Sequence, residues 1–173
     1  CRLVLKRKVD KEGNITKWKS RAVIQGFAQK AGIYYHRLYQ PVAALSTLRA
    51  QAAIATHRGE SLKSWDFENA FAQSDYNIED KDFQMFIRYP PGIRPIWARD
   101  HKTGRLRKSV LEVKRAQYGA KQSPRCWGIR LHRWMVKQGF RRSSTDSCLY
   151  LMDWEARESY TSGSLHDPDI DPN

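Results

Sequence analysis

The sequence predicts a single α+β domain in which an antiparallel sheet and helices pack together. Three observations support this fold class. Stretches of alternating apolar and polar residues are separated by turns that contain Gly or Pro, as in strands joined by tight connections. Two other segments carry the capping residues and the spacing of helices. Finally, 173 residues with 40% hydrophobic side chains and six Trp supply enough apolar material for one core.

Residues 1–29 are expected to form a β-hairpin. An apolar run at 3–5 leads into Lys6-Arg7-Lys8 and a polar turn at 10–14, after which residues 15–27 again alternate loosely. Eight Lys or Arg stand here against two acids. The hairpin is therefore a basic finger. Its charges either meet an anion or, in the simpler interpretation, solvate the strands and prevent edge pairing.

Two helices are predicted at 47–58 and 124–138. Ser46 offers a hydroxyl cap to the first helix and Gly59 stands just past its end. In the same way Ser123 precedes a Pro in the first turn of the second helix, and Gly139 ends it. Both segments therefore carry start and stop signals.

Two further strands follow from the pattern. Between 83 and 89 every second residue is apolar, and Pro-Pro-Gly at 90–92 ends the run. Residues 148–152 form a short apolar stretch that is typical of a buried strand. Residues 153–173 are acidic and poor in large apolar residues, and we expect this tail to be disordered.

The second predicted helix is amphipathic, with an apolar and a basic stripe. The apolar stripe holds Trp127, Leu131, Trp134 and Met135, and the basic stripe holds Arg130, Arg133 and Lys137. The apolar stripe is most simply core, and the basic stripe has the spacing to follow a phosphate backbone.

The charge of the chain indicates a polyanionic partner. The formal net charge is +13, and the stretch 99–142 alone carries fourteen Lys or Arg against two acids. Clustered cations gain affinity by releasing counterions from phosphates, so nucleic acid is the first candidate and a merely solvated basic surface the second. Three Cys without paired spacing predict no disulfide framework and suit a reducing compartment. No apolar run in the sequence approaches the length of a membrane span. We expect the chain to be part of a longer protein.

The run 64–71, Ser-Trp-Asp-Phe-Glu-Asn-Ala-Phe, holds the first candidate catalytic residue. One interpretation places the Asp66 carboxylate at the end of a buried strand, where its charge would need a cation or several donors. The other makes Asp66 the cap of a helix over 67–73. The local pattern leaves both open.

Several short motifs, in one order, resemble the reverse transcriptase domain of copia-type retrotransposons. They include Lys-x-Arg leading to Gly-Phe, Asp-x-x-x-Ala-Phe, and Tyr-Gly-x-Lys-Gln-x-Pro-Arg-x-Trp. The segments that carry the resemblance are 19–27, 32–35, 41–43, 66–71, 90–92, 118–127, 139–140 and 148–150.

The resemblance implies a right-hand polymerase fold, with fingers and part of the palm at 1–152, that acts as an RNA-directed DNA polymerase. It implies Asp66 as catalytic carboxylate and Mg²⁺ ligand, with the backbone carbonyl of Phe67 as a second ligand. The implied nucleotide-binding residues are Lys19, Arg21, Phe71 and Gln122. The expected nucleic-acid contacts are Tyr118, Lys121, Arg125, Arg130, Arg133 and Lys137.

The resemblance also implies partners and a location. The partners are an RNA or DNA template-primer, deoxynucleoside triphosphates and the remainder of a polyprotein, without a membrane. The location is intracellular, cytoplasmic or nuclear, in a virus-like particle for the intact element.

One departure from the family pattern matters most. The Tyr-x-Asp-Asp motif expected after 148–152 is missing, so the chain alone is expected to be inactive. Glu68 is the nearest other acid, but the missing ligands belong to a different strand. Smaller departures stand at Tyr34, Ser74 and Ala120. Two alternatives therefore remain: a non-catalytic basic module that binds nucleic acid, and a decayed transposon remnant.

Overall fold

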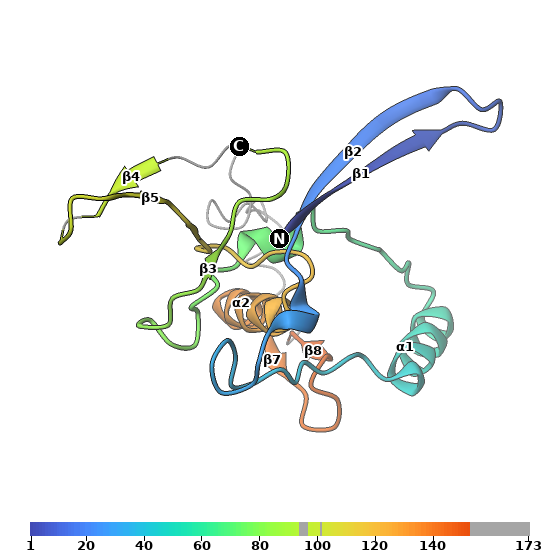
Figure 1. Ribbon diagram of the computed structural model, residues 1–173. Coiled ribbons are helices and arrows are strands. Elements are labelled where there is room, and N and C mark those ends of the chain that lie inside the picture. Colours follow the sequence, from blue (N-terminus) through green and yellow to red (C-terminus); the bar gives the residue numbers. More distant parts are fainter. Residues whose placement is uncertain (94–96, 101, 153–173) are drawn as a thin grey trace. The chain divides into compact units, whose positions relative to one another are not determined.

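The computed structural model describes residues 1–93, 97–100 and 102–152 (Figure 1). Within them the chain is a mixture of helices and short strands, and every strand pair is antiparallel, which confirms the α+β class. The strands are β1 (Arg2–Val9), β2 (Ile15–Val23), β3 (Phe86–Ile87), β4 (Trp97–Arg99), β5 (Leu106–Lys108), β6 (Leu111–Glu112), β7 (Arg141–Arg142) and β8 (Tyr150–Leu151). The helices are α1 (Leu45–Arg58), α2 (Ser123–Lys137) and two short 3₁₀ turns, η1 (Gly26–Ala28) and η2 (Ala70–Gln73).

The contacts divide the chain into two compact units, where the sequence predicted one. The first unit comprises residues 1–38 and 71–127, and the second comprises 39–70 and 128 onward. Each unit is thus built from two stretches of chain that are distant in the sequence.

Strands β1 and β2 form the predicted hairpin, a long two-stranded ribbon (Figure 1). In the turn, the Asp10 carboxylate accepts the Asn14 N–H at 2.7 Å, and Gly13 adopts a φ of 88°. Because side chains alternate along a strand, the register gives the hairpin two different faces. One carries Lys6, Lys8, Lys17, Lys19 and Arg21, here called the basic hairpin face; the other carries Leu3, Leu5, Arg7 and Trp18.

The core of the first unit lies where the chain at 74–88 runs beside 111–117. The N–H of Tyr76 bonds the carbonyl of Lys114 at 2.9 Å, and the N–H of Val113 bonds that of Met85 at 2.8 Å. Buried side chains here include Tyr76, Ile78, Met85, Val113, Ala116 and Cys126. Of the strand predicted at 83–89, only β3 pairs with another strand. The predicted alternation of buried and exposed side chains is nevertheless present, because Met85 is buried while its neighbours in sequence are exposed.

In the second unit α1 ends as predicted but begins differently. Gly59 stands past its C-terminus with a φ of 65°. The predicted Ser46 cap is wrong: the N-cap is Ala44, which has no capping side chain. Instead, one carboxylate oxygen of Asp146 accepts the Ala44 N–H at 3.0 Å and the Thr47 hydroxyl at 2.6 Å. A distant carboxylate thus lies at the helix start and accepts from one backbone N–H and one hydroxyl there.

Helix α2 spans almost the predicted residues. Ser123 is the first residue of the helix and not its cap, and its hydroxyl donates to the carbonyl of Gln117 at 2.7 Å. Trp134 is buried with 6% of its surface exposed, which confirms its place in the core. At Gly128, the end of the Gln40 side chain occupies the place where a Cβ would stand, so a larger residue there would displace Gln40. Gly139 follows the helix with a φ of 83°.

The strand predicted at 148–152 is present as β8, which pairs with β7 over two residues. The tail predicted to be disordered, 153–173, lies outside the described residues. Within the described part of the chain, no helix has the length and apolar character that a membrane crossing requires.

Candidate nucleic-acid interface

Three of the predicted nucleotide and nucleic-acid residues meet in the first unit. The Arg21 guanidinium lies 5.1 Å from the centre of the Tyr118 ring, a cation–π contact. Phe71 meets the same ring edge-to-face, with the ring centres 5.2 Å apart. These residues come from β2, from η2 and from the segment before α2. We call them the Tyr118 cluster.

Two glycines allow this meeting. A Cβ on Gly119 would lie 2.2 Å from the carbonyl oxygen of Ile24, and a Cβ on Gly26 would lie 2.2 Å from the carbonyl oxygen of Gly119. The close approach lets the Ile24 N–H bond the Tyr118 carbonyl at 2.8 Å. The Gly-Phe and Tyr-Gly motifs therefore join the base of the hairpin to the segment that carries Tyr118.

Lys121 is anchored beside the cluster by side chains that the sequence analysis did not select. Its N–H donates to the side-chain oxygen of Gln29 at 2.8 Å. Its ammonium group donates to the Gln29 carbonyl and to the Tyr35 hydroxyl, each at 3.2 Å, and lies 5.0 Å from the centre of the Tyr35 ring. Gln29 is buried and also donates to the Tyr76 hydroxyl at 3.1 Å. No sequence signal marked Gln29, whereas Tyr35 belongs to one of the motifs.

Gln122 lines a cavity of about 290 Å³ together with Tyr76, Phe83 and Cys126. Only 9% of its surface is exposed, and its amide nitrogen donates to the Tyr76 carbonyl at 3.5 Å. Its amide oxygen is buried without a hydrogen-bond partner among the described residues. The prediction that Gln122 lies over a nucleotide would therefore require a ligand that enters this cavity.

Burial also sets the protonation of two groups in this cavity. Desolvation raises the pKa of Tyr76 to about 12 and that of the Cys126 thiol to about 11. Cys126 is therefore a protonated thiol at neutral pH. It is a packing residue and a weak nucleophile.

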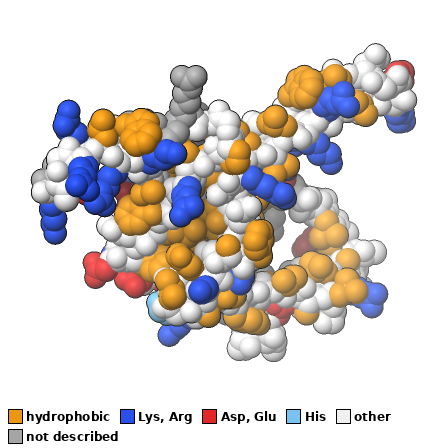
Figure 2. All heavy atoms as spheres, in the orientation of Figure 1, with side chains coloured by type: hydrophobic (Ala, Val, Ile, Leu, Met, Phe, Trp, Pro, Cys, Tyr) orange, Lys and Arg blue, Asp and Glu red, His pale blue; other side chains and the backbone are white. Residues whose placement is uncertain are grey.

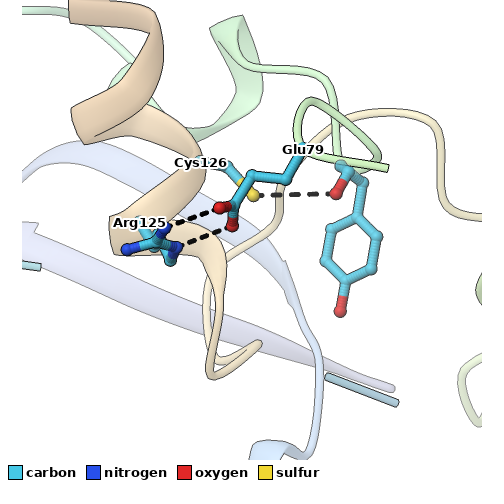
Figure 3. Close-up of polar contacts among 4 residues, drawn as sticks. Glu79, Arg125 and Cys126 are labelled. Atoms are coloured by element: carbon cyan, nitrogen blue, oxygen red, sulfur yellow. Dashed lines mark hydrogen bonds and ion pairs between the residues drawn. The ribbon is translucent and has the colours of Figure 1, made fainter. Parts of the chain in front are cut away.

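Arg125 forms an ion pair with Glu79, shown in Figure 3. Two guanidinium nitrogens each donate to a Glu79 oxygen at 2.6 Å, a bidentate arrangement. These hydrogen bonds raise the pKa of Arg125. Arg125 was predicted to contact nucleic acid, but here a carboxylate already compensates its charge. The sequence analysis missed Glu79, although the acidic run at 79–82 was visible.

Lys19 lies among like charges on the basic hairpin face. Its neighbours lower its pKa, Lys8 most, followed by partial burial and then Arg21 and Lys17. Lys19 and Arg21 stand two positions apart on one strand, so their side chains share a face. A bound anion would relieve this repulsion.

On α2, the predicted basic stripe is only partly accessible. Arg133 and Lys137 are exposed, but Arg130 is half-buried, and its Nε lies buried without a hydrogen-bond partner among the described residues.

The strand predicted to end at Asp66 is absent. Residues 60–67 pair with no described strand, and Leu62, Trp65 and Asp66 are exposed. Apolar residues alone do not make a strand, because its backbone groups need a neighbouring strand. The alternative helix over 67–73 is reduced to η2, which begins at Ala70. Asp66 therefore sits in an irregular, exposed segment, and Phe67 is half-buried beside it.

Comparison with known proteins decides the family. Residues 1–158 match the family described as reverse transcriptase (RNA-dependent DNA polymerase). The chain belongs to this reverse transcriptase family.

Among the relatives are Pol polyproteins of plant transposons, which are of the copia type. This reverse transcriptase chain is 28% identical over 152 residues to the retrovirus-related Pol polyprotein from transposon RE2 of Arabidopsis thaliana. It is 27% identical over 150 residues to that from transposon TNT 1-94 of Nicotiana tabacum. The matches cover 88% and 87% of this chain but only 10% of each relative. No solved structure matches the chain. The resemblance to copia-type reverse transcriptases is confirmed, and the chain spans about a tenth of these polyproteins.

Proposed function

We propose that residues 1–152 form the fingers and part of the palm of a copia-type reverse transcriptase, and that they hold a template-primer and an incoming deoxynucleoside triphosphate. The observation that carries the proposal is the Tyr118 cluster at the base of the basic hairpin face. Two of the residues expected to bind the nucleotide, Arg21 and Phe71, come from distant parts of the sequence. Both contact Tyr118, which was expected to contact nucleic acid.

The triphosphate is proposed to lie along Lys19 and Arg21. A triphosphate carries several negative charges, and these two cations share one face with three other Lys. The Tyr118 ring holds the Arg21 guanidinium in place before any ligand arrives, which lowers the entropic cost of binding. Phe71 packs against the same ring, so its position near a bound sugar is fixed as well.

The template-primer is proposed to meet the exposed cations of α2, Arg133 and Lys137. Contacts of this kind bind phosphates without reading the base sequence. Affinity should therefore fall steeply as salt increases.

The described residues do not fit a two-Mg²⁺ site. Two divalent ions a few ångströms apart repel each other and need carboxylates on both sides. In the described ranges no group of three or more His, Cys, Asp or Glu is placed to hold a metal ion. Asp66, with Glu68 two positions on, is exposed and irregular. We therefore propose that the chain binds its ligands but does not extend a primer by itself.

The missing carboxylates favour a second candidate function: a non-catalytic module that binds nucleic acid. It shares the phosphate contacts but needs no nucleotide site. Binding of a deoxynucleoside triphosphate separates the two candidates.

The test compares Arg21→Gln with Arg7→Gln. Both variants remove one Arg from the same hairpin, but Arg7 stands on the opposite face. Affinity for a deoxynucleoside triphosphate, measured by displacement of a fluorescent analogue, should fall about tenfold or more in Arg21→Gln, since a hydrogen bond to a charged group contributes about 1.5–3 kcal/mol. Arg7→Gln should retain nearly the wild-type affinity. Equal losses in the two variants would mean that general charge, not this site, binds the nucleotide.

A further inference from the structure

Strands β4 and β5 form a second exposed hairpin in the first unit. Trp97 stands opposite Lys108, and Arg99 stands opposite Leu106. Because successive side chains of a strand point to opposite faces, these four side chains share one face, here called the Trp97 face. Trp97 and Leu106 are 57% and 59% exposed. Figure 2 shows hydrophobic and basic side chains gathered over this hairpin.

Among the described residues of this hairpin, the positive charge is only partly compensated. Its acid, Asp100, belongs to the opposite face and pairs with Arg107 at 3.1 Å. The cations Arg99, Lys102, Arg105 and Lys108 are all exposed. On the Trp97 face, the Lys108 ammonium group lies 5.7 Å from the centre of the Trp97 ring. An exposed aromatic ring thus has one cation against it, and a second, Arg99, stands on the same face.

The turn fixes the hairpin in this shape. One Asp100 oxygen accepts the N–H groups of Lys102 at 3.0 Å and Thr103 at 2.9 Å, and Gly104 takes a φ of 65°. These hydrogen bonds, that of Thr103 first, lower the pKa of Asp100, so its carboxylate stays ionised and bonded at neutral pH. These turn hydrogen bonds favour the hairpin conformation before a ligand arrives, which reduces the cost of binding.

We propose that the Trp97 face binds a single-stranded nucleic acid, with one base stacked on Trp97 and the flanking phosphates on Lys108 and Arg99. Single-strand binding combines aromatic platforms with cations that follow the backbone, and this face offers both. A protein partner of ordinary composition would leave the cations around Trp97 without anions. The inference rests on the proposed nucleic-acid binding and adds a contact surface that lies outside the family motifs.

The test measures the affinity of the full chain for a fluorescent single-stranded oligothymidylate and for an abasic strand of equal length. Trp97→Ala should weaken oligothymidylate binding roughly 5- to 150-fold, the range for loss of one stacked base. The same variant should bind the abasic strand as the wild type does. Trp97→Tyr should retain most of the affinity, because its ring also stacks. Trp18→Ala is the matched control, since Trp18 is 66% exposed on the other hairpin, away from its basic face.

Two results would overturn the inference in distinguishable ways. If the wild type binds oligothymidylate and Trp97→Ala binds it equally well, the Trp97 face is not a stacking site, while the proposed function stands. If the wild type binds neither strand nor a primer-template, both fail. Lys108→Gln provides an independent check: the slope of log affinity against log salt should fall by about 0.7, as expected for one lost phosphate contact.

Discussion

Replacing Gly119 with Ala tests the packing that assembles the Tyr118 cluster. The added Cβ would lie 2.2 Å from the Ile24 carbonyl oxygen, and this oxygen belongs to the backbone, so it cannot turn away. To restore an ordinary contact distance, the backbone segments of Gly119 and Ile24 would have to move apart by roughly 1 Å. That movement weakens the Ile24 N–H bond to the Tyr118 carbonyl, worth about 1 kcal/mol. In addition, Gly119 has a φ of 83°, and a side chain in the left-handed region costs about 1–2 kcal/mol.

Together with the clash, these contributions give a loss of about 3 kcal/mol or more in the free energy of unfolding. Gly13→Ala is the matched control, because Gly13 has a φ of 88° and nothing within 4 Å of an added Cβ. It should lose only the backbone contribution of about 1–2 kcal/mol. Gly26→Ala isolates the clash, since its Cβ meets the Gly119 oxygen at 2.2 Å at a residue without positive φ.

The assay is urea unfolding followed by circular dichroism, with the slope checked for each variant. Nucleotide affinity is measured on the same proteins, and it should fall in Gly119→Ala and Gly26→Ala but not in Gly13→Ala. Equal stability losses for Gly119→Ala and Gly13→Ala would show that the close approach of the two backbone segments contributes nothing to stability, contrary to this prediction.

Two further predictions concern Asp146 and Cys126. Asp146→Ala should lower the urea midpoint at pH 7, because the start of α1 loses its hydrogen-bond acceptor. The Thr47 hydroxyl, and after it two backbone N–H groups, lower the pKa of Asp146 in the folded chain. The stabilisation is therefore complete above the ordinary pKa of about 4, and the difference between variant and wild type should vanish as the pH falls through the lower pKa of the folded chain. A difference that persists in acid would contradict this role. Burial raises the pKa of Cys126 to about 11, so this thiol should resist a thiol reagent at pH 8 until urea unfolds the chain. The half-buried Cys1 and Cys148 should react first. Rapid labelling of Cys126 in the folded chain would contradict its burial.

Local patterns in the sequence predicted much of the fold. The two long strands of the N-terminal hairpin and the extents of α1 and α2 follow from alternation, Gly residues and periodicity, which are properties of neighbouring residues. The helix starts did not follow, because Asp146 and Gln117, which replace or divert the expected caps, are distant or unmarked in the sequence. The strand at Asp66 failed for a similar reason, since a strand depends on a partner that the local pattern does not reveal.

The candidate site was predicted in part. The motif residues Arg21, Phe71 and Tyr118 do lie together, yet the sequence could not show that Glu79 compensates Arg125 or that Gln29 anchors Lys121. Such pairings depend on tertiary packing between segments whose spacing carries no signal. The Trp97 face was hidden for another reason: an exposed Trp and a buried Trp look alike until the strand register is known.

A primer-extension assay on the purified chain with Mg²⁺ or Mn²⁺, beside an Asp66→Asn control, tests most directly whether the chain binds its ligands without extending a primer. We expect the chain to bind an RNA–DNA primer-template and a deoxynucleoside triphosphate but to add no nucleotide, because its described carboxylates cannot neutralise two metal ions. Robust extension by the wild type that is lost in Asp66→Asn would contradict it.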